Sequence, residues 1–244
     1  MFRQAVFVVI SLLLLSACGP SHQEVADEYK QRILKKKTEI VAAAKLLQDV
    51  LFQKQDQQNQ GSLPLCEDTK IPLVFSRYGN SSNTTIAMHQ WLLNLDNRSH
   101  KIPFNLTSSY QLREALDWSS EPNPQDSIKD EKAEEGFREI FENVLGLEYL
   151  VLNQTLDFQE PRMLTVDQYR PGAVSVSMYV LSISPPAVLC QSSFTAETPD
   201  KVTSHQFSDF PDLGNANFAI RSSLFDQARE AQLAILKKVS ANVK

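Results

Sequence analysis

The chain of 244 residues contains no apolar run of the roughly 20 residues that a membrane-spanning helix needs. It has only 7 glycines, which argues against a repetitive or collagen-like chain. The net charge is −5 and no basic cluster is present, so the sequence offers no electrostatic footprint for nucleic acid. A hydrophobic content of 42% is nevertheless enough for a real core. These features indicate a folded protein that does not bind nucleic acid.

Motifs that carry catalysis or bind cofactors are also missing. The sequence has no GxSxG elbow, no GxxxxGK[ST] loop and no GxGxxG turn. The histidines are scattered, none belongs to an HExxH motif, and no two are four residues apart on one helical face. They are His22, His89, His100 and His205. We therefore predict no catalytic residue, no metal site and no cofactor, with a site assembled from distant positions as the alternative.

The first cysteine ends an unusual N-terminal stretch. Arg3 supplies a positive charge, residues 6–15 are apolar, and small residues precede Cys18. The charge, the short apolar run and the small residues fit an export signal. Leu15-Ser16-Ala17-Cys18 resembles the lipobox of bacterial lipoproteins. The resemblance implies cleavage before Cys18, diacylation of its sulfur and acylation of the new amine, whereas the alternative is an ordinary signal peptide with an incidental cysteine.

The residue after the lipobox bears on the destination of the protein. Position 19 is Gly rather than Asp. By resemblance to the sorting rule of Gram-negative bacteria, in which Asp after the cysteine favours the inner membrane, we expect an outer-membrane lipoprotein facing the periplasm if the source is Gram-negative. Two or more acyl chains would anchor it stably, because each buried methylene contributes about 0.8 kcal/mol.

Three segments are expected along the chain. Residues 1–17 form the signal peptide, residues 18–62 a lipid-anchored helical segment with a polar linker, and residues 63–244 a single domain. Apolar residues recur every seven positions between residues 23 and 55, which is typical of a helix. This helix either packs its apolar stripe on the domain or projects as a stalk. The stripe consists of Ile33, Ile40, Ala44, Leu47 and Leu51.

The rest of the chain mixes strands and helices. Alternating apolar residues predict strands over 149–158, 174–180 and 188–196, and the last two are joined as an antiparallel hairpin. Strands are also expected from residue 71 to 76 and from residue 84. Helical spacing predicts helices over 109–118, 127–145 and 220–239. The predicted fold is α+β, a mainly antiparallel sheet packed against long N-terminal and C-terminal helices.

Two cysteines remain after lipidation, Cys66 and Cys190. An exported bacterial domain meets an oxidising compartment, and two remaining cysteines make one pair. We predict a disulfide between them, with two unpaired core thiols as the alternative. A redox role is not expected, because the chain has no CxxC motif.

These features favour a non-enzymatic lipoprotein that binds an envelope partner, either a protein or peptidoglycan, in assembly or maintenance. The lipid bilayer is a further partner through acylated Cys18. An envelope hydrolase with a site assembled from distant residues is one alternative, and a carrier of a small or lipidic ligand is another. A deep cleft with buried polar groups would favour the hydrolase, an enclosed apolar cavity the carrier, and a flat sheet with an exposed apolar patch the binding protein.

Overall fold

A computed structural model describes residues 22–56, 63–74, 82–93, 112–113, 115–116, 131–165, 168–199 and 213–240. The chain forms two compact units. Unit 1 contains residues 1–38 and 110–146, and unit 2 contains residues 39–109 and 147–244. Unit 2 holds the sheet, and the described residues of unit 1 are helical or form a turn. No helix in the described ranges is long and apolar enough to cross a membrane.

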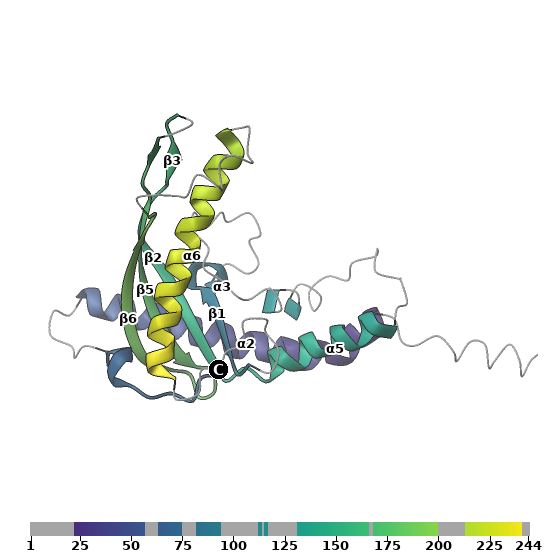
Figure 1. The fold of residues 1–244 in the computed structure, drawn as a ribbon. Coiled ribbons are helices and arrows are strands. Elements are labelled where there is room, and N and C mark those ends of the chain that lie inside the picture. The colour runs from purple at the N-terminus through teal and green to yellow at the C-terminus, as the bar shows by residue number, and fades with distance from the viewer. Residues whose placement is uncertain are drawn as a thin grey trace, which may run out of the picture. The chain divides into compact units, whose positions relative to one another are not determined.

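A four-stranded sheet forms the centre of unit 2 (Figure 1). Its strands are β1 (Thr84–Met88), β2 (Tyr149–Gln159), β5 (Ala173–Ser182) and β6 (Ala187–Glu197), and they lie in this order across the sheet. β1 pairs with β2 in parallel, while the β2–β5 and β5–β6 pairs are antiparallel. Two short strands, β3 (Arg162–Met163) and β4 (Tyr169–Arg170), pair separately between β2 and β5. The predicted α+β fold with a mainly antiparallel sheet is confirmed.

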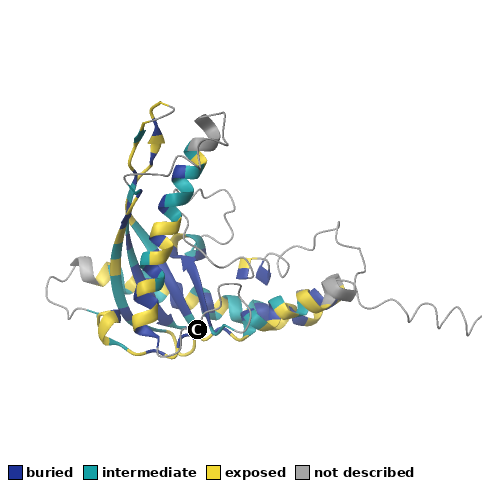
Figure 2. Cartoon of the chain, in the orientation of Figure 1, coloured by how far each residue is buried: buried dark blue, intermediate teal, exposed yellow. Residues whose placement is uncertain are grey.

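The β5–β6 hairpin follows the alternation of its sequence. Val174, Val176, Met178 and Val180 are buried on one face of the sheet. The other face of β5 is buried only next to the turn at residues 183–186, where Leu181 is fully buried. Figure 2 shows the same difference, with buried residues concentrated in β1 and β2 and partly exposed residues along β6. The predicted hairpin is therefore confirmed, and half of one face stays open.

Helix α6 (Leu213–Val239) covers the face of the sheet on which the alternate β5 residues from Val174 to Val180 are buried. Its apolar side chains join two core clusters with residues from all four strands. Gln232 of α6 donates a hydrogen bond of 2.9 Å to the side-chain oxygen of Asn153, and both side chains are buried. The C-terminal helix predicted over residues 220–239 is confirmed. Its apolar residues in the clusters are Leu224, Ala228, Ile235, Leu236 and Val239.

Helix α2 (His22–Asp56) begins in unit 1 and ends in unit 2. Four of the five stripe residues predicted from the sequence, Ile33, Ile40, Ala44 and Leu47, are fully buried, and the fifth is partly buried. In Figure 1, residues 39–56 pass behind the sheet, on the side opposite α6. The apolar stripe is therefore packed along most of its length rather than presented on a free stalk.

Unit 1 is organised around an aromatic contact between two helices. The ring of Tyr29 on α2 stacks on Phe141 of α5 (Glu131–Leu145), with ring centroids 5.1 Å apart. Arg138 donates to Glu28 over 2.7 Å beside this contact. The helix predicted over residues 127–145 is confirmed for α5, and its end before Gly146 is as predicted. Ser127-x-x-Asp130 matches a capping box at the start of this predicted helix, but these residues lie outside the described residues.

The prediction of a strand from residue 71 to 76 was wrong for residues 71–74, the part that the structure describes. Residues 72–74 have no strand structure, and Ile71 forms only a single bridge with Ser240. The main chain is held by other groups instead. Asn83 accepts a hydrogen bond from Val74 N over 2.8 Å and donates one to Pro72 O over 3.0 Å. The reason is local, because Pro72 has no N–H for a strand ladder.

The stretch after residue 84 forms a strand and then a short helix. The strand prediction is correct for β1, but residues His89–Leu93 form helix α3. The helix expected over 109–118 is described only at residues 112, 113, 115 and 116, which are helical. Residues 119–127, whose two prolines and polar residues predict a loop, lie outside the described residues.

Gly172 and Gly136 provide a matched pair for testing close packing. A Cβ atom at Gly172 would lie 2.5 Å from Pro161 Cδ and 2.8 Å from Gln159 O, whereas one at Gly136 would meet nothing within 4 Å. We expect Gly172→Ala to lower the free energy of unfolding by about 1–3 kcal/mol, as overpacking does. Gly136→Ala lies in helix α5 and should raise it by about 0.5–1 kcal/mol. Urea unfolding of both variants checks this, and equal stabilities would contradict the crowding at Gly172.

Candidate functional site

Of the histidines and cysteines, the structure describes the side chains of His89, Cys66 and Cys190. Cys18, His100 and His205 lie outside the described residues, as does the side chain of His22. Among the residues that are described, no group of three or more His, Cys, Asp or Glu side chains could hold a metal ion. The titratable residue of interest that remains is His89.

His89 is a buried residue at the start of α3. Its Nε2 atom lies 2.9 Å from the main-chain oxygen of Ala44 on α2. Burial lowers the pKa of His89 below its ordinary value of 6.5, and the hydrogen bond to Ala44 opposes this shift only in part. The ring is therefore neutral near pH 7, and Nε2 carries the proton that it donates to Ala44. The arrangement joins two helices and supplies no charged group for chemistry.

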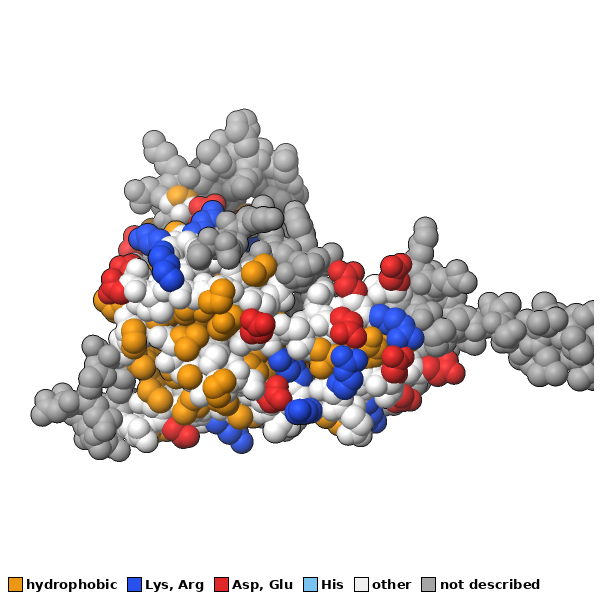
Figure 3. All heavy atoms as spheres, turned by 90° about the horizontal axis from the view of Figure 1, so that it is seen from below, with side chains coloured by type: hydrophobic (Ala, Val, Ile, Leu, Met, Phe, Trp, Pro, Cys, Tyr) orange, Lys and Arg blue, Asp and Glu red, His pale blue; other side chains and the backbone are white. Residues whose placement is uncertain are grey.

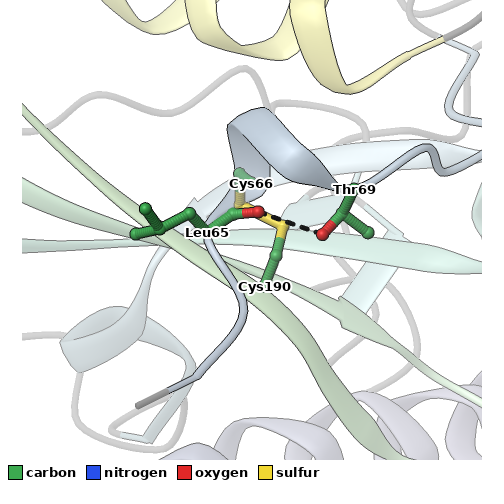
Figure 4. Close-up of a disulfide and its surroundings, with 4 residues drawn as sticks. All are labelled: Leu65, Cys66, Thr69 and Cys190. Atoms are coloured by element: carbon green, nitrogen blue, oxygen red, sulfur yellow. Dashed lines mark hydrogen bonds between the residues drawn. A yellow bond between two sulfur atoms is a disulfide. The ribbon is translucent and has the colours of Figure 1, made fainter.

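Cys66 and Cys190 lie at disulfide distance, with their Cα atoms 4.8 Å apart (Figure 4). Cys66 opens the short helix η1 (Cys66–Asp68), and Cys190 belongs to β6. Both are fully buried in the core cluster beneath α6. Thr69 donates its hydroxyl to Leu65 O over 3.0 Å and closes this turn. The positions of the two residues therefore confirm the predicted pairing of Cys66 with Cys190.

The segment around Cys66 meets both the core and the edge of the sheet. Because Cys190 faces the core, the predicted pairing requires Cys66 to reach the buried face of the sheet or its edge, with Leu65 and Ile71 near Phe194. Ile71 does join the cluster, and Phe194 packs against it. The side chain of Leu65, however, is 53% exposed. Its main chain contacts the edge of β6 through a parallel bridge with Gln191, so the contact is made by the backbone.

The edge of β6 beyond this bridge is the most distinctive surface of unit 2. β6 is the last strand of the sheet, and Figure 1 shows it along the outer edge. Gln191 N donates outward to Pro64 O over 2.9 Å. Because main-chain groups alternate along an antiparallel strand, those of Ser193, Thr195 and Glu197 also point outward. All three residues are exposed, and within the described ranges no residue pairs with their main chain.

The face of the sheet beside this edge is polar. Ser175 and Ser177 of β5 alternate with the valines that face α6, so they lie on the opposite face. Ser175 pairs with Thr195 of β6, and Ser177 pairs with Ser193. The two β5 serines are partly exposed and the two β6 residues are exposed. The result is a flat surface of small hydroxyl side chains that continues to the strand edge.

A second exposed surface is apolar and lies at the end of the sheet that carries the β5–β6 turn. Hydrophobic side chains gather on the face of the molecule shown in Figure 3. Exposed apolar residues at this end come from three loops, and two of these loops are tied to the sheet through Asn83 and Gln191. They are Pro64, Leu65, Pro72, Val74, Pro185 and Pro186. Exposed apolar groups of this kind are typical of contact surfaces.

The open edge of β6, residues 193–197, was not predicted from the sequence. Strand periodicity predicts which residues face the core, but it does not predict the order of strands in a sheet. A usable signal was present, because residues 187–197 contain no Lys or Pro, the residues that commonly protect an exposed edge. No family model, curated protein or solved structure matches the chain. The site must therefore be interpreted from its own geometry.

The disulfide should contribute strongly to stability, because it closes a loop across 124 residues. In the chain-entropy model a loop of about 100 residues is stabilised by roughly 4–5 kcal/mol, less any native strain. We expect the Cys66→Ala/Cys190→Ala variant to unfold at a markedly lower urea concentration than the oxidised protein. Reduced wild-type protein is the control and should approach the variant. Labelling of both thiols in oxidised, non-reduced protein would contradict the bond.

His89 should make stability depend on pH. Its lowered pKa keeps the ring neutral in the folded chain, while the unfolded chain takes up a proton as the pH falls through 6.5. The unfolded state then binds more protons, so the free energy of unfolding decreases below pH 6.5 until the folded-state pKa is reached. Thermal unfolding from pH 8 to pH 5 measures this loss. The His89→Gln variant should have a lower melting temperature at pH 8, but its melting temperature should depend less on pH between 8 and 5. If it depends on pH as steeply as that of the wild type, groups other than His89 cause the loss of stability.

Proposed function

We propose that this chain is a membrane-tethered, non-enzymatic lipoprotein of the cell envelope that binds an envelope partner, a protein or peptidoglycan, in assembly or maintenance. The observation that carries the proposal is the open edge of β6, where the main chain of Ser193, Thr195 and Glu197 faces outward without a partner in the described ranges. A strand at the edge of a sheet presents a row of N–H and C=O groups with which another chain can pair. An exposed row of them beside a flat face is suited to recognition rather than to catalysis.

The tether is proposed from the lipobox at residues 15–18. Acylated Cys18 would place the chain on a bilayer, and the absence of Asp at position 19 favours the outer membrane if the source is Gram-negative. Attachment to one surface raises the local concentration of the domain near other envelope components. Even a small recognition surface can then be effective, because tethering converts part of the binding into an intramolecular event.

The non-enzymatic part of the proposal is supported by the buried polar groups. Acid–base catalysis at neutral pH uses titratable groups whose environments separate their pKa values. The titratable groups among the buried residues that the structure describes are His89, whose ring is committed to a main-chain oxygen, and the phenols of Tyr29 and Tyr179. Burial raises the pKa of Tyr29, so its phenol stays protonated at neutral pH. The other buried polar residues have hydroxyl and amide side chains, for example Asn153 and Gln232, which bond each other. Such groups support a rigid binding domain.

Cys18→Ser tests the tether. Without the sulfur that accepts the acyl chains, the protein should move from the membrane fraction to the soluble fraction or remain as an unprocessed precursor. Fractionation of cells expressing the full chain, with immunoblotting, measures this shift. Ala17→Gly, which retains a small residue before Cys18, is the matched control and should stay in the membrane fraction. A cleaved Cys18→Ser protein that remains membrane-bound would contradict the proposal.

An assay with purified protein distinguishes binding from hydrolysis. The purified chain should leave isolated peptidoglycan intact, because a binding protein without a catalytic site does not cleave its partner. Release of soluble wall fragments by the wild-type chain, measured by chromatography, would establish the hydrolase alternative. A heat-denatured sample of the same protein is the control for contaminating activity.

A further inference from the structure

We propose that the binding partner is a protein that adds an extended segment of about five residues to the open edge of β6 over residues 193–197. This inference rests on the proposed function and names the chemistry of the partner. In this mode, main-chain hydrogen bonds supply affinity and alternating side chains supply specificity.

The main-chain groups on this edge have the spacing of a strand partner. Ser193, Thr195 and Glu197 each present an N–H and a C=O on the outward side, by alternation from Gln191. Residues two apart in a strand are separated by about 6.6–6.8 Å. Another extended polypeptide has donors and acceptors at the same repeat. A glycan chain does not, which favours a protein segment over the sugar backbone of peptidoglycan.

The edge already pairs with extended chain at its lower end. Pro64 and Leu65 approach β6 there and form the parallel bridge to Gln191. Residues 193–197 continue the same edge directly beyond this contact. The proposed segment would therefore extend an interaction that the fold itself uses.

The two edges of the sheet differ in how they are protected. Every residue of β1, at the opposite edge, is buried. On β6, exposed residues alternate beyond Gln191 with residues that are partly buried or, at Ala196, buried. The strand contains neither Lys nor Pro. Natural proteins usually protect an exposed edge with charge, proline or a covering segment. At β6 only Glu197, at the end of the strand, supplies a charge.

Side chains along the edge indicate what the segment should contain. Phe194 lies on the α6 side, packs against both core clusters and remains partly exposed, so an apolar residue should lie next to it. Ser193 and Thr195 lie on the polar face and accommodate small or polar residues. Glu197 is exposed at the end and favours a basic residue opposite it. The predicted segment thus alternates apolar and polar residues and carries Lys or Arg at one end.

Position-specific cross-linking in intact cells tests this inference with the full-length chain. A photoreactive amino acid at Ser193 reports on the edge. The same group at Ser177, on the inner strand of the same face, is the matched control, and one at Pro186 reports on the apolar end of the sheet. We expect a discrete protein adduct from position 193 that is destroyed by protease and not by a muramidase, with little or no adduct from position 177.

Two substitutions at Thr195 then test whether the main chain is recognised. Thr195→Pro removes the outward N–H, whereas the groups that pair with β5 belong to its neighbours. It should reduce the adduct from position 193 about tenfold, since a strand partner loses a hydrogen bond and meets the proline ring. Thr195→Ser keeps the N–H and the hydroxyl group, so it should lose far less of the yield than Thr195→Pro. Thr195→Lys keeps the main chain and adds an edge-protecting charge, so it should also reduce the yield.

The outcomes separate this inference from the proposed function. A muramidase-sensitive adduct at position 193, or an adduct only at position 186, would overturn strand addition while leaving a binding lipoprotein. An adduct that persists in both Thr195→Pro and Thr195→Lys would overturn it as well. Absence of adducts at positions 193, 177 and 186 would count against both proposals. The melting temperatures of the Thr195 variants are compared with that of the wild type. Where they match, a change in adduct yield reports on binding and not on folding.

Discussion

The hydrogen bond from Gln232 to Asn153 lies at the centre of the contact on which unit 2 depends, the packing of α6 on the sheet. Both amides are buried, so each needs a partner inside the fold, and leaving one unpaired would cost about 1–3 kcal/mol. Apolar side chains of α6 meet the strands on both sides of this bond, in two clusters. Hydrophobic burial supplies most of the stabilisation, while the amide pair favours a single position of the helix along β2.

Several other features follow from the position of α6. Ile71 N donates to Val239 O at the end of the helix, and Ser240 donates its hydroxyl to Leu73 O. The segment around residues 71–74 is therefore held by the helix end rather than by a strand ladder. Cys66 precedes this segment and is brought beneath α6, where Cys190 faces the same core. The disulfide thus reinforces a contact that the helix and sheet already establish.

The same arrangement leaves one edge and half of one face without cover in the described residues. α6 buries one face of β5 and β6 along their length, whereas the opposite face is buried only near the β5–β6 turn. Small hydroxyl side chains occupy the open half, and it is bordered by the outward main chain of residues 193–197, which has no partner among the described residues. Combined with a lipid anchor, such a domain would present a directional edge near a membrane surface. This combination underlies both proposals, and neither requires a reactive group.

Local periodicity in the sequence was enough to predict α2, α5, α6 and the β5–β6 hairpin, because each element buries one face and the spacing of apolar residues follows that face. The pairing of Cys66 with Cys190 was predictable from the number of cysteines together with the export signal that the sequence predicts. The parallel pairing of Thr84 with Tyr149, the helix that begins at His89 and the edge position of β6 were not. These features depend on contacts between residues distant in sequence, and only the tertiary structure decides the order of the strands and therefore which described strand lies at the edge of the sheet.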